Sequence, residues 1–307
     1  MALERLQKLI ARAGLCSRRD AEALIRERRV TVNGRVAELG EQADLDHDAV
    51  KIDGKRLKPP AALRYLLVNK PVGVVTTTED PEGRPTVLDL VRGKVGGRLF
   101  PVGRLDYASE GLVILTNDGD LAQKLMHPRY GVLREYEAKV RGVPDESARA
   151  RLRAGIVIAG RKVVPAAVEQ LRVTPSGLRS WWRVVVGEGK THEVRELFKS
   201  VGHPVQRLIR TAVGELRDPR LRPGAWRELD EYELDLLRRG GRRTRRGEHA
   251  PGANAGVHQQ DPRVRTGKAD RGGPARARPR RGDQAGLQRE PARRVTKSAR
   301  RHPQGAS

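Results

Sequence analysis

Residues 101–119 read PVGRLDYASEGLVILTNDG, a charged turn that contains glycine and is followed by an apolar run. The run Leu112–Leu115 is typical of a buried strand, because consecutive apolar residues leave no polar face. Asp106 lies in the turn before this run. An aspartate in a turn most often forms an Asx turn or caps a helix, so chemistry at Asp106 needs support from the rest of the chain.

On both sides of this stretch, β-rich runs and helical stretches follow one another in irregular order. The segment Tyr65-Leu66-Leu67-Val68 is the clearest further strand. The other β-rich runs cover residues 73–77, 136–140, 163–168 and 181–186, and the helical stretches cover residues 121–126, 146–153 and 194–201. Because helices and strands do not alternate strictly, the sequence predicts an α+β fold with a mixed sheet and not a doubly wound parallel one.

Residues 1–60 have the pattern of a small separate α+β module. Apolar residues recur at helical spacing from Leu3 to Ala13, and Ser17 with Asp20 forms the capping-box pattern that begins a second helix. The dipeptide Asn33-Gly34 between alternating apolar residues predicts a two-residue hairpin. Since Pro59-Pro60 is typical of a stiff linker, the second domain is expected to cover residues 61–238.

The last segment, residues 239–307, is predicted to be a disordered polycationic tail. Residues 241–307 hold 18 Lys and Arg against 5 Asp and Glu, and no Phe, Trp or Tyr follows Tyr232. So few apolar side chains cannot offset the entropy of ordering such a segment. The whole chain has a formal net charge of +24 and the part before the tail is basic as well, which favours a polyanionic partner.

Composition also excludes several classes of protein. The chain has no apolar run of about 18 residues, so neither a spanning helix nor a membrane partner is expected. The single cysteine, Cys16, excludes an internal disulfide framework and a cysteine-cluster zinc site. The histidines show no metal-ligand spacing, so no metal and no cofactor are expected. Because the N-terminus lacks the apolar run of a signal peptide, the predicted location is cytoplasmic.

The first segment resembles the S4 RNA-binding domain. The resemblance rests on Arg5-Leu6-x-Lys8-x-Ile10, Ser17-Arg18-Arg19-x-Ala21 and Val30-x-Val32-Asn33-Gly34. A cationic face beside a helix N-terminus suits RNA phosphates, whereas most charge runs are only solvated surface. The residues expected to bind RNA in this segment are Arg5, Lys8, Ser17, Arg18, Arg19 and Arg26.

Residues 64 to about 238 resemble the RsuA-type family of ribosomal RNA pseudouridine synthases, and within it the RluB-like branch that modifies large-subunit RNA. The motifs are Asn69-Lys70-Pro71-x-Gly73, Gly83–Leu90, Gly103-Arg104-Leu105-Asp106, Leu115–Gly119, Leu125–Pro128, Gly189–Arg195 and Gly202–Arg210. Many relatives carry Thr where this chain has Ser109, which retains the hydroxyl. The ordered spread of these motifs is hard to obtain by chance.

The resemblance implies a role for each of several residues. It assigns the nucleophile to Asp106, stacking on an extruded base to Tyr136 and an apolar wall to Leu208. It implies that Arg195 pairs with Asp106 and keeps it ionised, that Arg104 contacts the substrate, and that Lys70 belongs to the RNA-binding set. Each has an ordinary structural alternative: Tyr136 and Leu208 suit a core, and Arg195 suits an ion pair with an acidic neighbour.

The expected activity is therefore isomerisation of a specific uridine in ribosomal RNA, most simply in the large subunit, by a monomer acting on ribosomal RNA or a pre-ribosomal particle. Small-subunit RNA remains an alternative substrate. A ribosome assembly factor without catalytic activity is a second reading, although RNA binding alone would not require Asp106, Tyr136, Arg195 and Leu208 together. A nucleoid-compacting protein explains the charge but leaves the ordered motifs without a purpose.

Overall fold

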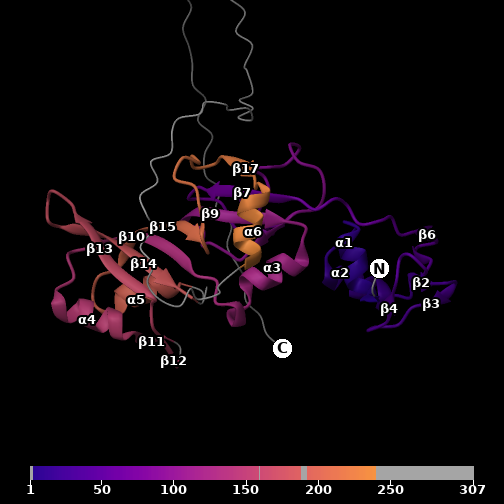
Figure 1. Ribbon diagram of the computed structural model, residues 1–307, viewed down its shortest axis with the longest axis horizontal. Coiled ribbons are helices and arrows are strands. Elements are labelled where there is room, and N and C mark those ends of the chain that lie inside the picture. Colours follow the sequence, from indigo (N-terminus) through magenta and orange to yellow (C-terminus); the bar gives the residue numbers. More distant parts are fainter. Residues whose placement is uncertain (1–2, 159, 188–191, 240–307) are drawn as a thin grey trace, which may run out of the picture. The chain divides into compact units, whose positions relative to one another are not determined.

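The computed structural model describes residues 3–158, 160–187 and 192–239 (Figure 1). Apart from Arg239, which ends the last helix, the predicted polycationic tail lies outside the described residues. Within the described ranges, no helix is long and apolar enough to cross a membrane.

The N-terminal segment is built from two short helices and small sheets. Its elements are β1 (Glu4–Arg5), α1 (Leu6–Arg12), α2 (Arg18–Arg26), β2 (Val30–Val32), β3 (Arg35–Val36), β4 (Gln42–Ala43), β5 (Val50–Ile52) and β6 (Lys55–Arg56). Strand β1 pairs with β4, and β3, β2, β5 and β6 form a four-stranded sheet in that order. A cluster of buried side chains that includes Leu6, Ile10, Ile25 and Val30 joins the helices to these strands.

Two local predictions for this segment are confirmed. Helix α2 begins with a full capping box, in which the Ser17 hydroxyl accepts from the Asp20 amide and the Asp20 carboxylate accepts from the Ser17 amide. The predicted hairpin joins β2 to β3, with Asn33 at φ 53° and Gly34 at φ 86°. Positive φ at both central residues is the requirement of a type I′ turn, which Asn-Gly meets at little cost.

The rest of the described chain surrounds one large sheet. This part of the chain has the strands β7 (Tyr65–Lys70), β8 (Phe100–Val102), β9 (Glu110–Thr116), β10 (Arg134–Arg141), β11 (Ile156–Ile158), β12 (Arg161–Val163), β13 (Ala167–Val173), β14 (Arg179–Val186), β15 (Val205–Val213), β16 (Leu216–Arg217) and β17 (Trp226–Glu228). Strands β11 and β12 pair with each other in a separate two-stranded sheet, and the other strands belong to the large sheet. Its helices are α3 (Gly119–Met126), the 3-10 turn Pro128–Tyr130, α4 (Glu146–Ala154), α5 (Glu193–Ser200) and α6 (Glu231–Arg239).

The order of the main strands is β13-β14-β10-β15-β9-β7-β17, with β16 paired to β15 and β8 paired to β9. Every described pairing in this sheet is antiparallel except that of β15 with β9, where Ile209 aligns with Glu110 and Arg210 with Gly111. The mixed α+β sheet predicted from the sequence is therefore confirmed.

Both faces of the sheet are covered around β9, all of whose residues are buried. On one face Val113 and Leu115 belong to a cluster that includes Leu197 and Phe198 of α5. On the other face Leu112 and Ile114 pack with side chains of α3 and α6. Figure 1 shows α4 and α5 beside β14 and β10, and α3 and α6 beside β7 and β9. The apolar run quoted first is thus the centre of the fold.

Two of the predicted β-rich runs are wrong in detail. Residues 73–77 form no regular strand, because this segment makes only one bridge, between Val75 and Thr86, and otherwise belongs to a loop. Residues 163–168 are divided between β12 and β13. Pro165 lies at this break, and its missing N–H cannot take part in a ladder.

Candidate active site

A pocket of about 510 Å³ opens where the loop before β9 meets β10, β15 and the start of α5. Its volume lies in the usual range for small-molecule sites. The residues that line it are Thr76, Thr77, Thr78, Pro101, Gly103, Arg104, Leu105, Asp106, Ser109, Met126, Arg134, Tyr136, Val186, His192, Glu193, Val194, Leu208 and Arg210. Sequence segments far apart therefore meet at one cavity.

Asp106 lies in the loop between β8 and β9, and its side chain is partly exposed in the pocket. Its carbonyl accepts from the Ser109 amide at 2.9 Å, which closes the turn that directs the carboxylate. His192 Nδ1 lies 3.1 Å from Asp106 Oδ2. His192 has φ 60°, in the left-handed region, at the N-terminal end of α5. The nucleophile expected from the sequence is thus accessible and touches an imidazole.

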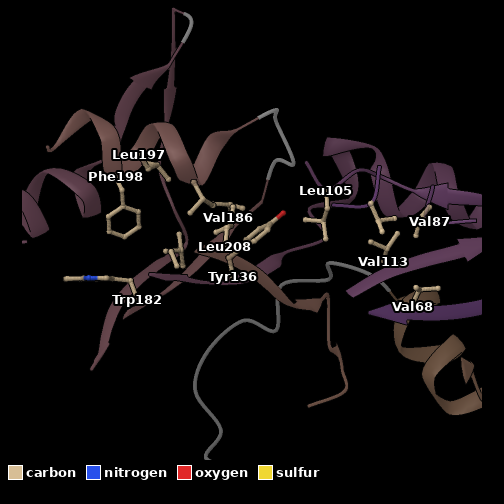
Figure 2. Packing of buried hydrophobic residues seen from close by; sticks show 14 of the residues in the cluster. Val68, Val87, Leu105, Val113, Tyr136, Trp182, Val186, Leu197, Phe198 and Leu208 are labelled. Carbon is tan, nitrogen blue, oxygen red and sulfur yellow. The ribbon is translucent and has the colours of Figure 1, made fainter. Parts of the chain in front are cut away.

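Tyr136 and Leu208 form an apolar wall of the same pocket. Tyr136 on β10 and Leu208 on β15 are buried, with 8% and 5% of their surface exposed. The two strands are neighbours, and Tyr136 shares its face of β10 with Ala138 and Val140. Figure 2 shows Tyr136 beside Leu208 and Val186, with its hydroxyl pointing toward Leu105. A flat base has an aromatic and an aliphatic surface here to pack against.

Arg195 differs from the expectation, because the structure does not join it to Asp106. Its Nη2 donates to the Ser109 hydroxyl at 3.0 Å and to the Ala108 carbonyl at 3.1 Å, and its Nη1 donates to the Val205 carbonyl at 3.3 Å. The guanidinium therefore fixes the loop just after Asp106 and ties it to the start of β15. The Ser109 hydroxyl accepts one of these hydrogen bonds, and a threonine at this position would supply the same group.

Lys70 is not available to RNA, contrary to the expectation. Its side chain is fully buried and its Nζ donates to the carbonyls of Pro71 at 2.9 Å and Val74 at 2.8 Å. Burial lowers its pKa from 10.5 to about 8, against the opposing charges of Asp106 and Glu110. The physical reason for the correction is strand geometry: the side chain at the end of β7 points into the protein and holds the following loop.

Three arginines with different surroundings also line the pocket. Arg104 is exposed, as a contact with substrate requires. Arg134 and Arg210 are buried, with 9% and 2% of their surface exposed. Burial, followed by the neighbouring charge of Arg210, lowers the pKa of Arg134. Among the described arginines that line the pocket, one is therefore accessible and two are enclosed.

The predicted RNA-binding residues of the N-terminal segment lie mainly on its surface. Arg5, Arg18, Arg19 and Arg26 are exposed, and Ser17 caps α2. Lys8 is partly buried and pairs with Glu4 at 3.1 Å. The helix N-terminus and the exposed guanidinium groups together present donors that phosphate oxygens accept from.

Sequence reasoning missed three pocket residues. His192 lies within the motif Gly189–Arg195 and Arg210 within the motif Gly202–Arg210, but neither motif indicates a role for them. Arg134 was passed over, although the alternation along β10 places it on the inward face that also carries Tyr136. An arginine on the apolar face of a strand is the signal that could have found it. Among the residues of the described ranges, no group of three or more His, Cys, Asp or Glu side chains is arranged to hold a metal ion.

Comparison with known protein families gives two matches. A family model described as RNA pseudouridylate synthase matches residues 64–200. A second model, described as S4 domain, matches residues 4–46.

Curated proteins and solved structures show similarity over most of the described chain. Ribosomal large subunit pseudouridine synthase B of Pseudomonas aeruginosa is 43% identical over 241 residues, which are 76% of this chain and 61% of that protein. Its namesake in Bacillus subtilis is 39% identical over 237 residues, 77% of this chain and 96% of that protein. A crystal structure of pseudouridylate synthase matches with a TM-score of 0.55 and 28% identity, covering 76% of this chain and 99% of that one.

Proposed function

Because the chain belongs to the family of RNA pseudouridylate synthases, we propose that it isomerises one uridine of large-subunit ribosomal RNA to pseudouridine. The choice of the large subunit follows the names of the relatives from Pseudomonas aeruginosa and Bacillus subtilis. The observation that carries the proposal is the shared pocket of Asp106, Tyr136 and Leu208. A protein that only binds RNA needs no carboxylate in an apolar pocket, since a negative charge repels phosphates.

The reaction exchanges one bond of the uracil ring for another. The N1–C1′ bond breaks, the ring turns in place, and a C5–C1′ bond forms; C5 loses its proton to solvent and N1 gains one. A uridine held in RNA structure must first leave its stack to reach a pocket. In the proposed arrangement the base packs against the wall formed by Tyr136 and Leu208, which places the ribose toward Asp106 at the loop before β9. The Asp106 carboxylate is the nucleophile of the first step.

The other residues position these groups. Arg195 holds the loop that carries Asp106 through Ser109 and Ala108, and Arg104 at the exposed rim meets the RNA backbone. His192 contacts the carboxylate before substrate arrives. In this scheme a misplacement of the loop by about 1 Å lowers the rate by about 100-fold, because the reacting atoms no longer meet in line.

In the proposed division of labour, residues 1–60 dock RNA through the exposed arginines of α2 and residues 61–238 carry out the chemistry. Phosphate contacts of this kind set affinity and orientation, and the pocket sets which base reacts. The proposed location is the cytoplasm, where ribosomal RNA or a pre-ribosomal particle is the substrate, and the proposed active unit is a monomer.

Pseudouridine mapping tests the proposal. Purified protein is incubated with large-subunit and small-subunit RNA, as free RNA and as precursor particles, and carbodiimide-dependent reverse-transcription stops locate new pseudouridines. A single new stop in large-subunit RNA is expected, absent with Asp106→Asn. A stop only in small-subunit RNA would overturn the choice of substrate. RNA binding without any stop would favour an assembly factor.

A further inference from the structure

The two enclosed arginines of the pocket donate hydrogen bonds to backbone carbonyls, and the charge of Glu193, a buried carboxylate of the same pocket, acts on Arg134. Arg210 Nε donates to the Leu112 carbonyl at 2.7 Å and its Nη1 to the Arg104 carbonyl at 3.4 Å, while its buried Nη2 has no hydrogen-bond partner. Arg134 donates only to the carbonyls of Leu125, Val132 and Gly187. Guanidinium groups stay charged at any physiological pH, so two positive charges lie enclosed at one wall.

These charges lie beside the residues proposed to hold the base. On β10, Arg134 is two positions from Tyr136 and so shares its face of the sheet; on β15, Arg210 stands in the same relation to Leu208. Arg210 also aligns directly with Tyr136 across the two strands. Phosphates of an extruded nucleotide stay near the pocket mouth, because the base enters first. The part of the substrate that reaches this wall is the uracil ring.

We propose that Arg134 and Arg210 form an electropositive wall that stabilises negative charge on the uracil ring while it is detached from the ribose. This inference rests on the proposed function. When the N1–C1′ bond breaks, its electron pair remains on N1 and the ring becomes an anion; C1′ is bonded to the Asp106 carboxylate. When C5 attacks C1′, the bond to Asp106 breaks and the negative charge returns to the Asp106 carboxylate. The C5 proton then leaves and N1 takes up a proton, which gives the neutral product.

The wall is held rigidly, as this role requires. Gly111 has φ +116°, and a Cβ there would lie only 2.3 Å from the Arg210 carbonyl oxygen, so β9 and β15 approach more closely than any other residue permits. The hydrogen bonds of Arg210 to Leu112 and Arg104 fix its guanidinium to that junction. Fixed charges in a water-poor site stabilise a developing anion without a cost of reorganisation at the moment of reaction.

The test compares two leaving groups. A site-containing RNA is made with uridine or with 4-thiouridine, whose ring keeps its C5 proton and carries negative charge more easily because sulfur delocalises it. Single-turnover rates of isomerisation are measured by nuclease digestion and mass-resolved chromatography of nucleosides. With uridine, Arg210→Met is expected to lower the rate by about 100-fold, the usual cost of losing one preorganised charge donor. With 4-thiouridine the loss should be below about 10-fold, and Arg210→Lys should retain more activity than Arg210→Met.

Arg134→Met provides a second, independent variant if Arg210→Met does not fold, as judged by thermal unfolding. Arg172→Met is the matched control, since Arg172 is exposed on β13, lies over Trp181 and does not line the pocket. The proposal would be overturned if the rate fell by the same factor with both RNAs, or if neither arginine variant lowered the rate. Absence of turnover by the unaltered protein on every RNA would instead contradict the proposed function.

Discussion

Arg195 illustrates how one side chain can matter without touching the reacting atoms. It fixes Ser109 and Ala108, which follow Asp106, the proposed nucleophile, by a few residues. Arg195→Ala should lower kcat by about 100-fold through misplacement of the loop, with little change in RNA affinity. Ser109→Ala removes one hydrogen-bond acceptor and should lower kcat by less than about 10-fold. Single-turnover rates and filter binding measure both; a large loss of RNA affinity in Arg195→Ala would contradict a positioning role.

The lowered pKa of Lys70 leads us to expect that the stability of the folded chain depends on pH. Its pKa is about 8 in the folded chain and 10.5 in an unfolded one, so between these values the unfolded state binds more protons. The Lys70 contribution to the free energy of unfolding should therefore rise by about 3 kcal/mol from pH 8 to 10.5 and stay constant below that window. Lys70→Met should lack this rise. Urea unfolding of both proteins at pH 7 and pH 10 measures the difference, and parallel pH profiles would count against it.

At the scale of elements, the junction of β9 with β15 depends on Gly111. An alanine there is strained at φ +116° and places Cβ within 2.8 Å of three backbone atoms of Arg210. Gly111→Ala should lower the free energy of unfolding by more than about 3 kcal/mol, because backbone cannot yield as a side chain can. Gly119→Ala is the control, since a Cβ there meets nothing within 4 Å. Denaturant unfolding compares the two, and similar midpoints would refute the argument.

Elements governed by local rules were predictable from the sequence. The capping box of α2, the Asn33-Gly34 hairpin and the buried strand around Leu112 each follow from a few adjacent residues, and the family and its S4 domain are confirmed by the comparisons. Contacts between distant segments were not predictable. The burial of Lys70 and the attachment of Arg195 to Ser109 depend on which strands become neighbours, and the chain encodes that choice only through the packing of the whole sheet.

At the scale of the whole molecule, the distribution of charge leads to a prediction about affinity. Residues 241–307 carry 18 basic and 5 acidic residues, whereas the described residues that line the pocket lie between Thr76 and Arg210. Removal of residues 241–307 should flatten the dependence of RNA affinity on salt, because each phosphate neutralised releases counterions, and should leave the modified site unchanged. Filter binding across a potassium chloride series compares the full chain with the shortened chain and with a variant whose tail has Gln in place of Lys and Arg. An unchanged slope would show that the tail does not bind RNA.

The parallel pairing of β9 with β15 also sets the order in which a growing chain becomes an enzyme. Glu110 and Arg207, 97 residues apart, are brought together only at this junction. Until β15 has left the ribosome, β9 and β10 keep unpaired edges, and Asp106 faces solvent without the Leu208 wall. Contacts of such long range form slowly. Synthesis must therefore pass β15 before catalysis can begin, and a nascent chain halted earlier presents open strand edges to chaperones and to its own copies.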